Sequence, residues 1–531
     1  MTIGDRLSLP DRLRIRRYAV PARMIAECAE ARERGDWRAA CEAGRIDVAF
    51  APQVAAEAEK LAAHLAPDLL RWHLPRALGG FTTLSNDERY LLVPDEPVAA
   101  DGVLLTVWAP VSVLGSQRLT LTAARVGRVS SVAVPAYLWD ARHAGGLRAA
   151  LGGSAERLPL LTPAAGGLPA ESLGAGDDLP ARAERVRGAF SAAAAFSEAG
   201  VEIAAGQDDE WSKADRNRVL AAIDPLRLSH DARWLAARFR HATWLLWAGP
   251  YRYLKITVDG DAVRAGWSSG HPRDPAPEVP RLHADLTRFD ADLELIRRGH
   301  LAPGALHPLV REALFPGVPP VVAEPYPPTG TELVRVRCRG DWHEIDVRLG
   351  RLDLRSHTPA EQQRERAMRA FGGEVSGCFA VEHAWYGAPG RLPRRLRAHR
   401  EDLWQRMIHG GTRTVLDLLD AGMDPQVRDS GGGTLMHRLR SFDHRRLLPR
   451  LLAEGLDVDA RDKEGGTPLY VTVVHRGPGA LIIALVDAGA DPYLPNQHHD
   501  TVIDHVDDLI KYRDDLEPDF EDAVAYLRKR A

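Results

Sequence analysis

Residues 432–441 read GGTLMHRLRS and residues 465–474 read GGTPLYVTVV, so one short phrase returns after 33 residues. A weaker copy of the phrase begins at Thr501, 34 residues after Thr467. Repetition at a fixed period of this length predicts a row of similar units. Such units stack on one another, because each alone leaves an apolar face that only a neighbour can cover.

The residues of one copy predict a pair of helices. We expect Thr467 to cap the first helix through its hydroxyl group, with Pro468 at a position where a helix tolerates a missing N–H. Gly489 then ends the second helix as a left-handed residue, and Gly455 and Gly422 precede it at steps of 34 and 33 residues. The second helix carries an apolar stripe at three- and four-residue spacing, formed by Leu481, Ile482, Leu485 and Val486.

A 33-residue period with a Thr-Pro-Leu-His opening, two helices and a Gly-Ala-Asp end resembles the ankyrin repeat, over about residues 397–531. The resemblance implies about four repeats, the first of them a degenerate copy near Glu401. The chain departs from the family pattern in that the opening histidine is present only at His437. The front of the chain resembles only uncharacterised bacterial proteins that end in ankyrin repeats, and this resemblance implies no activity.

Ankyrin repeats mostly bind other proteins through their turn tips and the exposed face of their first helices. The resemblance therefore implies a partner-binding surface formed by Gln426, Arg428, Arg438, Phe442, Asp459, Arg461, Val471, His475, Tyr493 and Asn496. We expect an exposed Phe442 beside Arg438, and Tyr493 at a tip, to act as anchors, because aromatic residues and arginine carry much of the energy of interfaces. The alternative is that each of these residues is an ordinary solvated surface residue.

The charge balance bears on the kind of partner. Lys and Arg total 69 and Asp and Glu 73 in the whole chain, a formal net charge of −4, which argues against a nucleic acid or an anionic membrane as partner. Residues 397–531 contain 18 Lys and Arg and 24 Asp and Glu, so their charge is 18 − 24 = −6. This favours a protein partner with a basic patch. The resemblance to bacterial proteins that end in ankyrin repeats implies one further candidate partner, a component of a system that contains an AAA+ ATPase.

Cysteine usage and hydropathy predict a cytoplasmic protein. Cys28, Cys41, Cys338 and Cys378 lie far apart, without a CxxC pair and without a histidine at metal-ligand spacing, so we expect buried thiols, no metal and no cofactor. The N-terminus has no secretory signal, and the longest run without a charge, 102–117, is too short to cross a bilayer. Only six of the basic residues are lysine, which indicates a high-GC bacterial genome.

The front three quarters of the chain divide by composition. Residues 1–144 predict a helical lead-in followed by β-rich runs, and the Gly- and Pro-rich residues 145–180 predict a linker or loop. Residues 181–396 predict an α+β domain that is helical up to about residue 248 and contains a Pro-rich connector at 316–330. After the connector, alternating residues around Gly340 and Asp341 predict a β-hairpin. The expected fold class is α+β: a mixed helical and β-rich body, followed by a short all-α ankyrin solenoid over 397–531.

Catalytic motifs give no support for an enzyme. Residues 266–270, GWSSG, match a nucleophile elbow, but the HPRDPAPEVP that follows cannot form the helix which that motif requires. No phosphate-binding glycine motif occurs, and we assign no catalytic residue. The leading hypothesis is a non-catalytic adaptor or scaffold. The alternatives are an enzyme or effector whose repeats target or regulate it, and an array that serves only as an intramolecular clasp.

Overall fold

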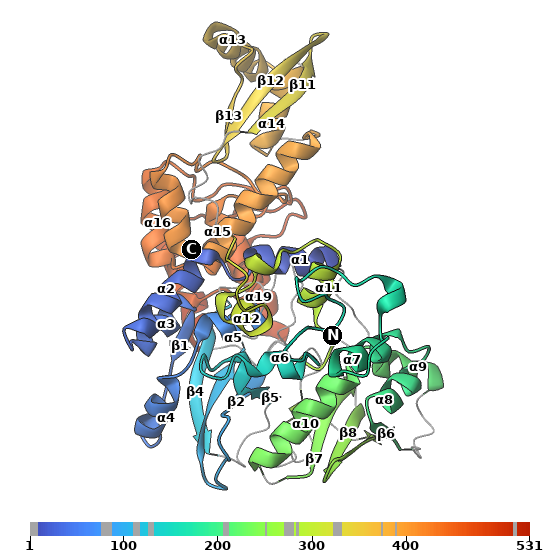
Figure 1. Ribbon diagram of the computed structural model, residues 1–531. Coiled ribbons are helices and arrows are strands. Elements are labelled where there is room, and N and C mark those ends of the chain that lie inside the picture. Colours follow the sequence, from blue (N-terminus) through green and yellow to red (C-terminus); the bar gives the residue numbers. More distant parts are fainter. Residues whose placement is uncertain are drawn as a thin grey trace. The chain divides into compact units, whose positions relative to one another are not determined.

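The computed structural model describes residues 9–75, 88–109, 117–125, 132–204, 212–239, 241–249, 252–269, 281–282, 286–321, 332–372, 375–387, 390–512 and 518–530 (Figure 1). The chain divides into two compact units. The N-terminal unit comprises Met1–Val113 and Gln117–Val322, and the C-terminal unit comprises Leu114–Ser116 and Ala323–Ala531. The division falls inside the expected connector at 316–330, whose residues 322–330 lie outside the described residues, and not at 145–180.

A mixed β-sheet organises the N-terminal unit. In the described part of the chain it has ten strands in the order β1-β4-β3-β2-β5-β10-β7-β8-β9-β6. The strands are β1 (Ile46–Val48), β2 (Arg89–Val93), β3 (Val103–Trp108), β4 (Leu119–Arg125), β5 (Val132–Pro135), β6 (Val201–Ile203), β7 (Thr243–Gly249), β8 (Arg252–Asp259), β9 (Ala262–Ser269) and β10 (Arg281–Leu282).

The helices of this unit are α1 (Leu9–Tyr18), α2 (Ala22–Glu33), α3 (Trp37–Ala43), α4 (Ala55–Ala62), α5 (Pro67–His73), α6 (Gly146–Ala150), α7 (Leu179–Gly188), α8 (Ala192–Glu198), α9 (Lys213–Leu220), α10 (Pro225–Phe239), α11 (Ala291–Arg297) and α12 (Pro308–Leu314).

The sheet consists of two copies of one arrangement. The order α2-α3-β1-α4-α5-β2-β3-β4-β5 is followed by α7-α8-β6-α9-α10-β7-β8-β9-β10. In each copy the first strand pairs in parallel with the fourth, the second, third and fourth form an antiparallel meander, and the fifth pairs in parallel with the second. The parallel pair of β5 and β10 joins the two copies.

Strand β2 shows how both faces of the sheet are buried. Tyr90 and Leu92 lie in one core, with apolar residues of α2 to α5. Leu91 and Val93 alternate with them and lie in a second core, with apolar residues of α7 to α10. The continuous apolar run of Tyr90, Leu91, Leu92 and Val93 is what a strand buried on both faces requires.

The C-terminal unit begins with a small antiparallel sheet, β11 (Glu332–Cys338), β12 (Asp341–Arg348) and β13 (Arg351–Asp353), followed by α13 (Pro359–Ala370) and α14 (Gly377–Trp385) (Figure 1). We call the described residues 332–372 and 375–387 the cap module. The expected hairpin is confirmed, and it turns through Arg339 and Gly340, both at positive φ.

The remainder of the unit is helical. Its elements are α15 (Arg394–Asp420), which is interrupted at Gly411, the 3-10 helix η4 (Leu435–Ser441), α16 (His444–Ala453), α17 (Pro468–Val474), α18 (Gly479–Asp487), α19 (Val502–Tyr512) and α20 (Pro518–Arg530). We call residues 397–531 the repeat segment. One hydrophobic core runs from Val334 in β11 to Leu527 in α20, so the cap module and the repeat segment share a core.

Two hydrogen bonds join the cap module to the first repeat. The amide of Asp424 donates to the carbonyl of Leu349 at 3.0 Å, and the Tyr386 hydroxyl donates to the Asp424 carboxylate at 2.6 Å. The cap module therefore covers the end of the stack that would otherwise expose the apolar face of its first unit.

The expected fold class is wrong. The chain is a mixed α/β protein, because its N-terminal unit is built on the ten-stranded sheet of the described residues and its C-terminal unit contains the sheet β11–β13. It is therefore not an α+β body followed by an all-α solenoid. The sheet was missed because parallel pairs such as Ile46 with Leu119 join residues that are far apart in sequence. The local alternation of apolar and polar residues does not indicate which distant strands pair.

The helix expected to reach residue 248 ends at Phe239 instead. Thr243–Gly249 is strand β7, in which Trp244, Leu246 and Ala248 face the core. Residues 145–180, expected to be a linker, include α6, and they bury Leu147, Leu158 and Leu161 in the core of the N-terminal unit.

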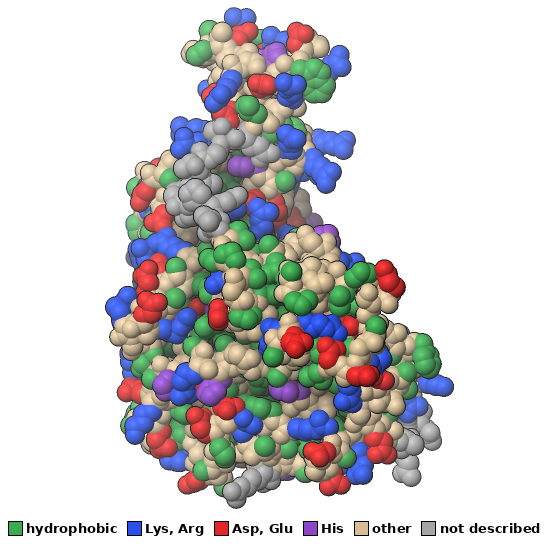
Figure 2. Space-filling view, in the orientation of Figure 1, with side chains coloured by type: hydrophobic (Ala, Val, Ile, Leu, Met, Phe, Trp, Pro, Cys, Tyr) green, Lys and Arg blue, Asp and Glu red, His purple; other side chains and the backbone are tan. Residues whose placement is uncertain are grey.

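The surface carries charges of both signs. Basic and acidic side chains are interspersed over the face that Figure 2 shows, as the small net charge of −4 suggests. Among the described residues, no helix is long and apolar enough to cross a membrane.

Candidate functional site

Three tight turns repeat along the edge of the repeat segment, at residues 429–433, 462–466 and 496–500. In each, the amide of the first residue donates to the carbonyl of the fifth, at 2.9, 3.1 and 2.9 Å. The side chain of the first residue, Asp429, Asp462 or Asn496, accepts a hydrogen bond from the amide of the fifth at 2.9, 2.8 and 3.0 Å. The shared geometry explains why a short polar acceptor recurs at this period, and why the fourth residue of each turn, Gly432, Gly465 or His499, has a positive φ.

Arginine side chains tie successive turns together. Nη1 of Arg428 donates to the carbonyls of Gly432 and Arg461, each at 2.7 Å. One repeat later, Nη1 of Arg461 donates in the same way to the carbonyls of Gly465 and Pro495. These two arginines were expected to contact a partner, but their guanidinium groups hold the backbone of neighbouring turns.

His437 also links two repeats. Its Nδ1 accepts a hydrogen bond from the amide of Thr434 at 3.0 Å, and its Nε2 lies 3.1 Å from the carbonyl of Gly466, to which it donates. Burial lowers the pKa of His437, so the imidazole stays neutral and keeps one acceptor and one donor nitrogen.

A groove of about 340 Å³ lies beside the turns. It is lined by the first helices and the turns of successive repeats, including Asp429, His437, Arg438, Arg440, Asp462, Glu464, Tyr470, Val471, Val474, His475, Asn496, His498 and Asp500. We call this surface the repeat groove. Of the residues expected to bind a partner, Arg438, Val471, His475 and Asn496 line it, whereas Gln426, Arg428, Phe442, Asp459, Arg461 and Tyr493 do not.

Phe442 is not the exposed anchor that we expected. Only 7% of it is accessible, because it ends η4 and packs into the core of the C-terminal unit. Tyr493, by contrast, is 55% exposed beside the third turn. Asp459 is half-buried, and its carboxylate accepts a hydrogen bond from the amide of Asp491 at 3.0 Å.

The side chains that line the repeat groove carry a net negative charge. Arg438 neutralises Asp429 through bonds of 2.6 and 2.9 Å from its Nη2 and Nε atoms. Arg440 is buried, which lowers its pKa to about 10. Within the part of the chain that the structure describes, Asp462, Glu464 and Asp500 form no ion pair, so carboxylates dominate the free charge of the groove.

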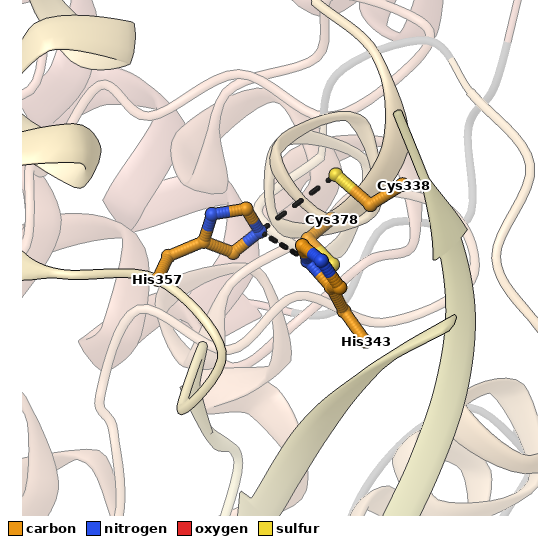
Figure 3. A group of neighbouring side chains, drawn as sticks. All are labelled: Cys338, His343, His357 and Cys378. Atoms are coloured by element: carbon orange, nitrogen blue, oxygen red, sulfur yellow. Dashed lines mark hydrogen bonds between the residues drawn. The ribbon is translucent and has the colours of Figure 1, made fainter. Parts of the chain in front are cut away.

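Outside the groove, the structure brings together residues that we had treated as unrelated. Cys338 and Cys378 meet His343 and His357 inside the cap module, and all four offer a metal-ligating atom (Figure 3). Sequence reasoning missed this group because four, 13 and 20 residues separate its successive members. The chain has no CxxC pair, the spacing by which many zinc sites are recognised in a sequence.

Ser268 of the GWSSG match lies inside β9 and pairs with Tyr253 of β8. A serine in the middle of an antiparallel strand is not held in the sharp strand-to-helix turn of a nucleophile elbow.

No family model and no curated protein matches the chain. The assignment of the repeat segment to the ankyrin family therefore stays a prediction that rests on its period and its residues.

Proposed function

We propose that the protein is a non-catalytic adaptor that binds a partner protein in the repeat groove. The observation that carries the proposal is the groove itself, in which turns of successive repeats stand in register and are cross-linked through Arg428 and Arg461. A surface held by such bonds loses little conformational freedom when a partner binds, and this preserves affinity. Arg438 and Tyr470, which line the groove, are of the residue types that most often carry interface energy.

The partner that fits this groove presents a basic segment. Glu464 and Asp500 are exposed at its rim, and the half-buried Asp462 lies in the same turn as Glu464. Complementary charge raises the association rate and rejects acidic partners. A component of a system that contains an AAA+ ATPase is the candidate that the ankyrin resemblance supplies, and we propose it as the first to test.

We further propose that the protein works in the bacterial cytoplasm. Its four cysteines are buried free thiols, and thiols persist where the compartment is reducing.

Charge reversal in the groove tests the adaptor function. The full-length protein is used as bait in lysate of the source organism, and the captured protein is then purified and titrated calorimetrically. The double variant Glu464→Lys with Asp500→Lys should weaken binding at least about tenfold, since each reversal replaces attraction by repulsion. Asp522→Lys, an exposed change on α20 away from the groove, should bind like the wild type. Equal binding by all three proteins would exclude the groove.

A second candidate function, in the enzyme or effector class, is favoured by one feature of the N-terminal unit. A cleft of about 900 Å³ is lined by α1, α7 and α11 and contains Arg12, Arg187, Arg288 and Asp290. In the adjoining small cavity, burial raises the pKa of Asp292, which Arg16 and Trp72 contact at 2.6 and 3.2 Å. Arginines that converge on a cleft, beside a cavity with a perturbed carboxyl group, are typical of a site for an anionic small molecule.

Thermal stabilisation of the full-length protein by inorganic phosphate, pyrophosphate and a nucleoside triphosphate tests this second function. Binding to the folded state raises the melting temperature. Arg187→Gln should abolish the rise in melting temperature. Arg264→Gln, at an exposed position in β9, is the control and should leave the rise unchanged. The absence of any rise with all three anions would reject anion binding in the cleft.

A further inference from the structure

We propose that Cys338, His343, His357 and Cys378 bind one zinc ion, which fixes the cap module at the end of the repeat segment. The four side chains come from different elements: the end of β11, the middle of β12, the loop after β13 and the first turn of α14. They converge on one point (Figure 3), and their ligand atoms all lie within 4.8 Å of one another.

The spacing of the ligand atoms suits tetrahedral zinc. With Zn–S bonds of about 2.3 Å and Zn–N bonds of about 2.0 to 2.1 Å, ligand atoms in a tetrahedral site lie roughly 3.3 to 3.8 Å apart. Sγ of Cys338 is 3.7 Å from Nε2 of His357, and Nδ1 of His343 is 2.9 Å from the same Nε2. The first of these distances already lies in the zinc range, and the second has to lengthen by about 0.4 Å. Because no pair of ligand atoms is more than 4.8 Å apart, no other distance has to shorten by more than about 1 Å.

Ligand chemistry selects the metal. Two thiolates and two imidazoles form a Cys₂His₂ set, which is typical of structural zinc and unsuited to the oxygen-preferring ions Mg²⁺ and Ca²⁺. The charge also balances, since Zn²⁺ and two thiolates with two neutral imidazoles sum to zero. A neutral site is the kind that a buried location tolerates.

Burial makes the site a closed one. Cys338, His357 and Cys378 are buried and His343 is half-buried. The ring of Phe379 lies 4.5 Å from that of His357 and screens this side. Four protein ligands, three of them buried, leave no coordination position for water or substrate, which indicates a structural and not a catalytic metal.

The backbone around the site is shaped for close approach. Gly377 precedes Cys378 at φ +59°, and a Cβ atom there would lie 2.4 Å from Sγ of Cys338. Only a residue without a side chain allows the start of α14 to bring Cys378 against the end of β11.

The position of the site explains what the metal does. It joins the hairpin β11–β12 to α14, whose Trp385 hydrogen-bonds the carbonyl of Gly350 and whose next residue, Tyr386, reaches Asp424 of the first repeat. Zinc binding would release the two thiol protons to solvent and add its binding energy to the folding of the cap module.

Metal analysis of the full-length protein tests the proposal. Protein expressed with zinc and dialysed without chelator should contain about one zinc per chain by elemental mass spectrometry. Replacement by Co²⁺ should give the thiolate charge-transfer and ligand-field absorption of tetrahedral cobalt. Cys378→Ser should bind zinc at least about 100-fold more weakly, beyond the 10- to 100-fold typical of outer-shell changes.

A matched control separates metal loss from misfolding. Cys41→Ser alters a thiol that is equally buried, in α3 of the N-terminal unit, and should keep about one zinc per chain. The proposal is overturned if wild-type protein binds neither zinc nor cobalt, or if Cys41→Ser loses as much zinc as Cys378→Ser. It is also overturned if mass spectrometry shows a Cys338–Cys378 disulfide in protein that was purified with a reductant present.

Discussion

The indole Nε1 of Trp385 donates a hydrogen bond of 2.8 Å to the main-chain carbonyl of Gly350, and both residues are buried. The bond joins α14 to the turn between β12 and β13. In the same turn, the carbonyl of Leu349 accepts a hydrogen bond from the amide of Asp424 in the first repeat. The cap module is therefore attached to the repeat segment by a main-chain hydrogen bond, from Asp424 to Leu349, as well as by apolar packing.

Trp385→Phe should lower the stability of the C-terminal unit by about 1 to 3 kcal/mol, because it leaves the buried carbonyl of Gly350 without a partner. Scanning calorimetry of the full-length protein measures the shift in its transition. Trp342→Phe is the control, since Trp342 is 65% exposed on β12, and should change stability by less than about 0.5 kcal/mol. Equal shifts in the two variants would show that the bond contributes nothing.

Arg461→Lys should destabilise the repeat segment by about 1 kcal/mol, a modest value because Arg461 is exposed. One arginine nitrogen bridges the carbonyls of Gly465 and Pro495, and lysine lacks the planar fork that holds the side chain in this position. Urea unfolding followed by circular dichroism measures the effect. Arg476→Lys, also at an exposed position, should leave the midpoint unchanged.

Gly465→Ala should destabilise the protein more than Gly455→Ala. Both glycines have positive φ, +75° and +80°, so each substitution incurs the strain of a left-handed residue, about 1 to 2 kcal/mol. A Cβ at Gly455 meets open space, whereas one at Gly465 would lie 2.9 Å from the amide nitrogen of Gln497 in the next turn. Thermal unfolding of the two variants compares them, and equal losses would mean that the turns are not packed as closely as the structure shows.

Acidification should destabilise the repeat segment partly through His437. Its folded pKa lies below the unfolded value of about 6.5, so below that pH the unfolded chain binds more protons than the folded one. Stability is then full above the unfolded pKa and falls by up to about 1.4 kcal/mol per pH unit until the folded pKa is reached. His437→Gln should show a shallower loss between pH 7 and pH 5.5, measured as the melting temperature at each pH. An unchanged slope would assign the acid sensitivity to other groups.

The repeat segment was the part of the fold most open to prediction from sequence. The 33-residue spacing of Thr434 and Thr467 reflects structure that forms within each repeat. Thr467 caps α17 as expected, because its hydroxyl oxygen accepts a hydrogen bond of 3.2 Å from the amide of Tyr470. The hairpin at Gly340 was equally visible, because alternation and a turn lie within twenty residues. In both cases the determining contacts join residues close in sequence.

The sheet of the N-terminal unit and the Cys-His group were beyond such reasoning. The pairing of Ile46 with Leu119 and of Arg281 with Val132 depends on how distant strands dock. The ligands of the proposed zinc site converge only because α14 packs on β11, so their spacing matches no short motif. The sequence predicts Arg428 and Arg461 as turn residues, but only the three-dimensional structure shows that their guanidinium groups bond within the protein.

Site-specific photo-crosslinking in cells tests the adaptor function most directly. A photoreactive amino acid at Val471, on the wall of the repeat groove, should form an adduct with one partner protein that has a basic segment. The same amino acid at Asp522 of α20 should not form that adduct. Adducts of equal yield at both positions, or none at Val471 in cells where the partner is present, would contradict the account.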